Sequence, residues 1–171
     1  MRRFERIEYS VITKAAPELA WQVFSDWELW PQFSELYEDI RWTQGEPWQE
    51  GSRLSIRTRA PMGVTLDHVI ISCVPAQKVG WIDHAIGTTL EQWVHFESHP
   101  DRGTLVRTWA EFTGEMPRVA GRSIKDLLLE FTRTWYNRYA AECDRAADRK
   151  QSQSEKETAE GHPIEQRDSL A

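Results

Sequence analysis

The sequence predicts an α+β fold: a curved antiparallel sheet of about seven strands wrapped around one long C-terminal helix, with two short helices after the first strand. Three observations predict it. After Tyr37 the hydrophobic period changes from about 3.6 to about 2 residues. The later connections, PAQ, GT and HPDRG, are short and turn-like, so neighbouring strands must be antiparallel. Near the C-terminus one continuous apolar stripe recurs at helical spacing.

The chain opens with a strand and two short helices. Residues 4–13, FERIEYSVIT, are rich in Ile, Tyr, Val and Thr, which is typical of a strand. A helix should follow from Pro17, because proline suits the first helical position and Glu18 suits the positive end of the helix dipole. A second short helix is predicted from Pro31 to about Tyr37.

The middle of the chain alternates apolar and polar residues. In GSRLSIRTR, Leu54 and Ile56 alternate with arginines and a serine, which indicates a strand with one solvated face. The same pattern, bounded by turn residues, places strands at 38–45, 51–59, 64–74, 78–86, 89–98 and 104–114.

The last ordered element is a helix from about Ser123 to Arg149, roughly 40 Å long. We expect one domain over residues 1–149, followed by a disordered acidic tail over 150–171, which has almost no bulky apolar residues. The apolar stripe of the helix consists of Ile124, Leu128, Phe131, Trp135 and Tyr139.

Composition narrows the function classes. The 171-residue chain has a net charge of −6, which argues against nucleic acid as its main partner. No apolar run approaches the about 20 residues of a membrane span, and we expect no secretory signal, because no apolar segment follows the basic residues of MRRFERIEYS. Cys73 and Cys143 lie far apart, which argues against a disulfide framework and a structural zinc site. These features predict a cytoplasmic protein. No nucleotide-binding motif is present, and we predict no cofactor.

Several stretches resemble the START/Bet v 1-like superfamily (SRPBCC), in particular bacterial polyketide cyclase/dehydrase and lipid-transport-type proteins. They are VITKAAPELAWQVFSDWELWPQF, VPAQKVGWI and EQWVHFESHPDRGTLVRTWAEFTGE. The resemblance covers about residues 6–145 and implies a helix-grip fold with a cavity between the long helix and the concave face of the sheet. In the family's later hairpin, G.T.V…..F.G, the matching residues are Gly103, Thr104, Val106, Phe112 and Gly114.

In each strand the more apolar alternate set should face this cavity. His68, His84 and His95 then fall on the outer face, too far apart to share a metal ion, so no metal site is predicted. The inward set is Leu54, Ile56, Thr58; Val69, Ile71, Cys73; Val79, Trp81, Asp83; Leu90, Gln92, Val94, Phe96; and Thr104, Val106, Thr108, Ala110, Phe112.

A polar row crosses the inward face in one register. If Phe96 pairs with Thr104, and Trp81 with Val94, then Asp83, Gln92 and Thr108 lie side by side. Asp83 is the one candidate for a catalytic acid or base; alternatively it reaches solvent at the strand end and only bonds Gln92. The predicted cavity lining is Phe33, Trp42, Ile56, Thr58, Val69, Ile71, Trp81, Asp83, Gln92, Val94, Thr108, Leu128, Phe131 and Trp135.

Three functions fit this sequence. The first is binding of a small hydrophobic ligand that is aromatic, polyketide-like or lipidic. The second, implied by the resemblance, is a polyketide cyclase or dehydratase that positions a reactive substrate. The third is a protein-interaction module with a vestigial cavity. A single inward titratable group on the strands favours binding over catalysis.

Overall fold

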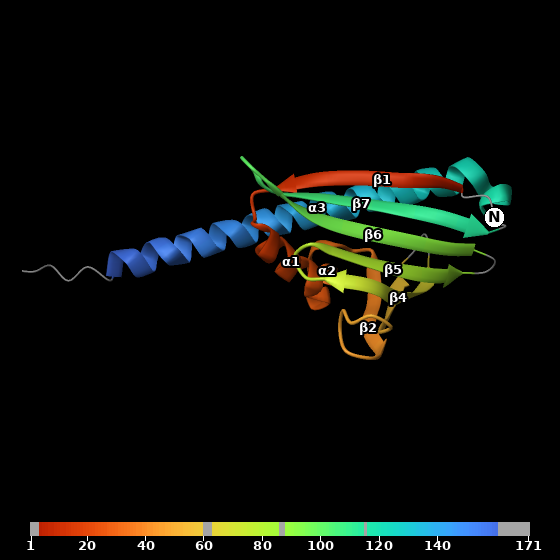
Figure 1. Ribbon diagram of the computed structural model, residues 1–171, viewed down its shortest axis with the longest axis horizontal. Coiled ribbons are helices and arrows are strands. Elements are labelled where there is room, and N and C mark those ends of the chain that lie inside the picture. The colour runs from red at the N-terminus through yellow and green to blue at the C-terminus, as the bar shows by residue number, and fades with distance from the viewer. Residues whose placement is uncertain (1–3, 60–62, 86–87, 115, 161–171) are drawn as a thin grey trace, which may run out of the picture.

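The computed structural model describes residues 4–59, 63–85, 88–114 and 116–160. Seven antiparallel strands form one sheet in the order β1-β7-β6-β5-β4-β3-β2. Figure 1 shows β1, β7, β6, β5 and β4 side by side in this order. This confirms the predicted fold. The elements are β1 (Phe4–Thr13), α1 (Pro17–Ser25), the 3-10 helix η1 (Trp27–Leu29), α2 (Trp30–Phe33), β2 (Tyr37–Gln44), β3 (Arg53–Thr58), β4 (Thr65–Val74), β5 (Lys78–Ala85), β6 (Thr88–His99), β7 (Gly103–Gly114) and α3 (Met116–Glu160).

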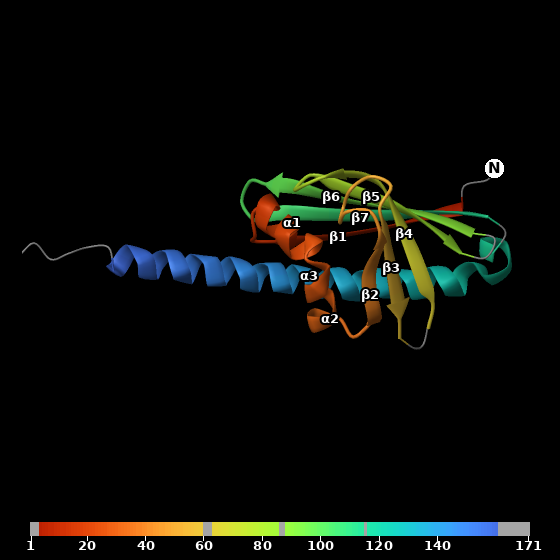
Figure 2. The ribbon, with the colours of Figure 1, turned by 90° about the horizontal axis from the view of Figure 1, so that it is seen from below.

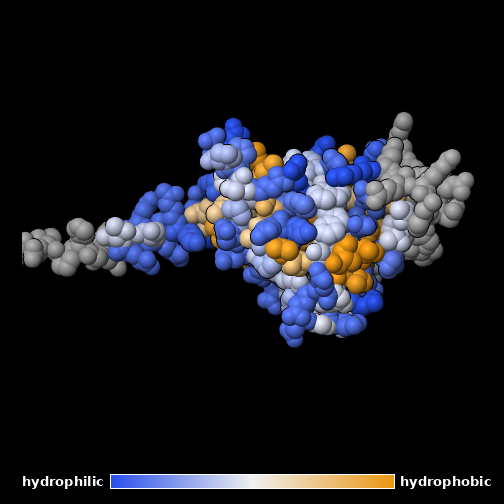
Figure 3. Space-filling model, in the orientation of Figure 1, coloured by the Kyte–Doolittle hydropathy of each residue, from blue (hydrophilic) through white to orange (hydrophobic). Residues whose placement is uncertain are grey.

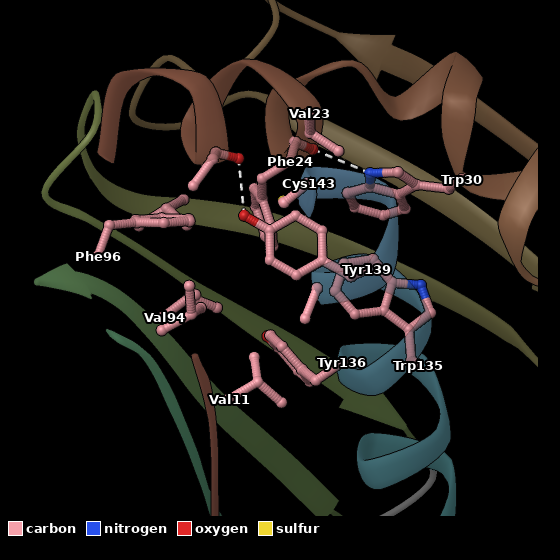
Figure 4. Close-up of a cluster of buried hydrophobic side chains, with 14 of the residues drawn as sticks. Val11, Val23, Phe24, Trp30, Val94, Phe96, Trp135, Tyr136, Tyr139 and Cys143 are labelled. Atoms are coloured by element: carbon pink, nitrogen blue, oxygen red, sulfur yellow. Dashed lines mark hydrogen bonds between the residues drawn. The ribbon is translucent and has the colours of Figure 1, made fainter. Parts of the chain in front are cut away.

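Helix α3 runs along one side of the sheet, and α1 and α2 pack against it (Figure 2). Aromatic rings fill the space between these helices and the sheet (Figure 4). Trp135 of α3 stacks on Tyr139 with ring centroids 5.4 Å apart, and Phe24 of α1 meets Trp135 edge-on at 5.9 Å. Most of these rings therefore belong to the hydrophobic core. They also limit the space that a cavity between the helices and the sheet can occupy.

Helix α3 is longer than the sequence predicts at both ends. It begins at Met116 rather than Ser123, and it continues through Glu160, past the predicted boundary at Arg149. The side chains of residues 150–158 are all exposed. Residues with high helix propensity can continue a helix into solvent even when the added segment has no apolar face and buries no side chains. Residues 161–171 of the expected tail lie outside the described residues.

Despite this length, α3 is too polar for a membrane. Across the part of the chain that the structure describes, no helix is both long and apolar enough to span a bilayer.

The first part of strand β4, up to Ile70, faces the opposite way from the prediction, whereas Cys73, beyond a register shift, packs against the core as predicted. Ile70 is 1% exposed and His68 is 9% exposed, whereas Val69 and Ile71 are half-buried on the outer side. Both alternate sets of β4 are apolar, so periodicity alone does not choose between them. Pairing with β3 determines which side of β4 faces inward, because His68 lies opposite the inward-facing Leu54. The outer set leaves an apolar patch over β4 and β5 on an otherwise largely polar face (Figure 3).

Both hairpins next to the cavity are shifted by two residues from the predicted register. Phe96 pairs with Val106 rather than Thr104, and Trp81 pairs with Gln92 rather than Val94. A shift of two keeps every side chain on its predicted face but separates Asp83 from Gln92.

The turn chemistry accounts for the β6–β7 register. Gly103 pairs with His99 and has a φ of +87°, the left-handed conformation that commonly closes a three-residue hairpin loop. An added Cβ would lie 2.5 Å from the Lys14 carbonyl carbon, so this position excludes larger residues.

Candidate ligand-binding cavity

A cavity of about 150 Å³ lies between α3, the residues around α2, and the concave face of β3 to β6. Its walls are mainly aromatic and aliphatic. An apolar cavity of this size accommodates a single aromatic ring. The predicted residues that do line it are Ile56, Thr58, Trp81, Asp83, Gln92, Leu128, Phe131 and Trp135.

The other predicted residues lie outside this lining. Val69 and Ile71 are on the far face of the sheet, because β4 is oriented the other way. Phe33 packs edge-on against Trp135 at 5.7 Å, and Trp42 against Trp48 at 5.3 Å. The remaining two, Val94 and Thr108, are buried in the core of the sheet.

Sequence reasoning missed part of the wall. Trp30 lines the cavity, and its ring is held in place because Nε1 donates to the Phe24 carbonyl oxygen at 2.9 Å. On α3, Thr132 lies one helical turn after Leu128, and Tyr136 lies one turn after Thr132. Both are next to the apolar stripe, and this spacing could have identified them. Leu90, which was expected on the inward face, also lines the cavity. The unpredicted lining residues are Phe24, Trp30, Leu36, Tyr37, Leu66, His68, Thr132 and Tyr136.

The most informative of these is His68. It was predicted on the outer face, but its side chain lies inside, where Nδ1 makes a short hydrogen bond to Asp83 Oδ1. Asp83 is 2% exposed, so the alternative in which it merely reaches solvent is excluded. The His68 ring also lies against Trp81, with centroids 5.2 Å apart. Among the described residues, no third His, Cys, Asp or Glu joins this pair in a group fit for a metal ion.

The comparisons with known proteins rest on structure alone. No family model matches the sequence, and no curated protein matches it. A START superfamily protein from Mycobacterium smegmatis superposes with a TM-score of 0.68 at 14% identity, covering 82% of this chain and 97% of that one. The chain therefore has a helix-grip fold like that of this START superfamily protein.

Two enzymes share this helix-grip fold. Norcoclaurine synthase of Thalictrum, solved with a transition-state analogue, has a TM-score of 0.65 at 10% identity, covering 84% of this chain and 96% of that one. The di-domain ARO/CYC StfQ of the steffimycin biosynthetic pathway has a TM-score of 0.65 at 13% identity, covering 86% of this chain and 51% of that one. These likenesses concern the fold.

Three polar atoms of the residues that line the cavity lack partners. Asp83 Oδ2, Trp81 Nε1 and Trp135 Nε1 are buried and make no hydrogen bond to any described residue. Leaving one such atom unpaired costs about 1–3 kcal/mol. The carboxylate oxygen is an acceptor and the two indole N–H groups are donors, so a ligand with a hydroxyl, amine or carbonyl group could pair with one or more of them.

A second polar group lies along β6 and β7. Gln92 Nε2 donates to Thr108 Oγ1 at 3.2 Å, although these residues are not directly opposite, and Thr108 donates to the Trp93 carbonyl oxygen at 3.0 Å. Burial raises the pKa of Tyr136 well above its ordinary value, and interaction with Thr108 and Gln92 only partly offsets this. The Tyr136 hydroxyl therefore stays protonated and acts as a neutral group in the cavity.

Proposed function

We propose that the protein binds a small planar, mainly apolar molecule carrying one hydroxyl, amine or carbonyl group. The observation that carries this proposal is the buried His68–Asp83 pair in the wall of an otherwise aromatic cavity. Ligand sites typically combine apolar walls with a few polar groups that fix orientation. Norcoclaurine synthase, solved with a transition-state analogue, supports small-molecule binding on this scaffold.

The size of the cavity narrows the ligand class. About 150 Å³ suits one aromatic ring, whereas drug-sized ligands occupy pockets of about 300–1,000 Å³. Rings of Phe24, Trp30, Trp81 and Trp135 offer faces and edges for an aromatic partner. A single-ring aromatic compound is therefore favoured over a lipid chain.

Titration calorimetry of the full chain with toluene and phenol tests this proposal. Both compounds should bind, and phenol should bind about fivefold or more tightly, because its hydroxyl can pair with the unpartnered Asp83 Oδ2 or with His68. Equal affinities would show that the polar pair does not take part in recognition.

A matched pair of variants on α3 tests the location. Leu128 lines the cavity, so Leu128→Trp should fill it and abolish toluene binding. The adjacent Leu127 is 41% exposed and outside the lining, so Leu127→Trp should bind toluene as the wild type does. Unchanged toluene binding in folded Leu128→Trp would contradict the proposed site. No binding by the wild type would favour the interaction-module function.

A further inference from the structure

We propose that the cavity is also a proton-transfer site, in which His68 is the general base and Asp83 orients it. This inference rests on the proposed ligand-binding function and adds a reaction to it. A carboxylate can only accept hydrogen bonds, so an ionised Asp83 requires the proton on Nδ1 of His68. In the neutral imidazole, Nε2 is then unprotonated and has a lone pair available to a ligand.

The described residues contain no hydrogen-bond partner for His68 Nε2. The contact with Asp83 is made by Nδ1, and the ring is held on its other side by Trp81 at 5.2 Å between centroids. His68 is 9% exposed, so bulk water competes little with a bound ligand for this nitrogen. A base that is oriented, largely buried and next to a cavity has the arrangement that general base catalysis needs.

Asp83 acts through His68 rather than on the ligand. When His68 takes a proton, the imidazolium is stabilised by the buried carboxylate beside Nδ1. Asp83 is thus a positioning residue, and it belongs to the neighbouring strand β5, which fixes its distance from β4.

Trp81 supplies the third part of the site. Its Nε1 is a buried donor without a partner, and the residue lines the same cavity as His68. A donor of this kind stabilises negative charge that develops on a ligand oxygen. The substrate class is therefore a small cyclic compound with an acidic C–H near a carbonyl or ring oxygen.

The reaction that this arrangement supports is an isomerisation. His68 Nε2 removes a proton from carbon, and the C–H electron pair forms an enolate whose oxygen accepts from Trp81 Nε1–H. The imidazolium then returns the proton to another atom of the same molecule. No oxidant, reductant or co-reactant is consumed.

The test uses 5-nitro-1,2-benzisoxazole, a planar probe with one acidic C–H. A base removes this proton, the N–O bond breaks, and a coloured cyano-nitrophenolate forms, so turnover is followed by absorbance. Binding of the probe to the full chain is measured separately, by quenching of tryptophan fluorescence.

We expect wild-type protein to accelerate ring opening, and His68→Gln to lower the rate by about tenfold or more. His84→Gln is the control: His84 is exposed, contacts Thr89, and should be dispensable. If folded His68→Gln binds the probe and keeps the wild-type rate, the inference is wrong while ligand binding stands. If wild-type protein binds toluene but not the probe, this inference is wrong while the proposed ligand binding stands; if it binds neither compound, both fail.

Nitrogen NMR of the imidazole tests the role of Asp83 without any ligand. His68 should carry its proton on Nδ1 in the wild type. In Asp83→Asn the amide can donate to Nδ1, so the proton should move to Nε2 and the rate should fall although His68 is intact. An unchanged tautomer and rate in Asp83→Asn would remove Asp83 from the mechanism.

Discussion

The hydroxyl of Tyr139, in the middle of α3, donates a 2.7 Å hydrogen bond to the carbonyl oxygen of Ala20 in α1 (Figure 4). Both residues are fully buried, and 119 positions of sequence separate them. Burial raises the pKa of Tyr139 well above its ordinary value, so the hydroxyl keeps its proton. This bond joins the long helix to the helix beside the cavity.

Removing that hydroxyl should destabilise the fold. Tyr139→Phe leaves the buried Ala20 carbonyl without this donor, and we expect a loss of about 1–2 kcal/mol in the free energy of unfolding in urea. The control is Tyr9→Phe, which removes an exposed hydroxyl bonded to Asn137 and should change stability by less than about 0.5 kcal/mol. Equal effects of the two variants would contradict this account.

A second prediction concerns the contact between β1 and α3. Asp144 Oδ1 accepts from Thr13 Oγ1 at 2.6 Å and from the Lys14 backbone N–H at 2.9 Å. Asp144→Ala should therefore lower the midpoint of thermal unfolding and cost about 2 kcal/mol. Asp148→Ala, four residues along the helix, removes only an exposed ion pair with Lys14 and should cost less than about 1 kcal/mol.

The third prediction concerns Gly80, which lies opposite Trp93 in the sheet. An added Cβ would lie 2.6 Å from the Trp93 ring, so Gly80→Ala should force the indole aside and cost about 1–3 kcal/mol in urea unfolding. In the background of Trp93→Leu the same substitution should cost clearly less, because the clashing ring is gone. A strictly additive double variant would refute the clash.

The fourth prediction is a pH dependence. Burial favours the neutral form of Glu142, but hydrogen bonds and charges from Arg149 and Arg145 outweigh it and lower the pKa of Glu142 below its ordinary value of 4.5. Its contribution to stability is therefore present above pH 4.5 and is lost as the pH falls through the lower, folded-state pKa. Wild type should exceed Glu142→Gln in stability at pH 7, and the difference should vanish towards pH 3. A constant difference would contradict this assignment.

Prediction succeeded where one side of a strand is clearly polar. In β3 the arginines at 53 and 57 leave no choice about which face is inward, and Leu54, Ile56 and Thr58 are indeed buried. In β4 the apolar residues occupy both sides, and the prediction chose the wrong side for the part of the strand before the register shift. Because of that single error, His68 was predicted on the surface instead of in the cavity. The predicted cavity then had only one titratable group, and this favoured binding over catalysis as the predicted function.

The sequence by itself determined the order of elements, the antiparallel sheet and the presence of a long amphipathic helix. These depend on local signals: periodicity, proline and glycine positions, and turn length. Only the tertiary structure decided the strand registers, the orientation of β4 and the meeting of His68 with Asp83. A shift of two residues changes no hydrophobic pattern, and a strand that is apolar on both sides takes its orientation from its neighbours. The polar pair in the cavity is consequently a product of strand pairing, which no local pattern encodes.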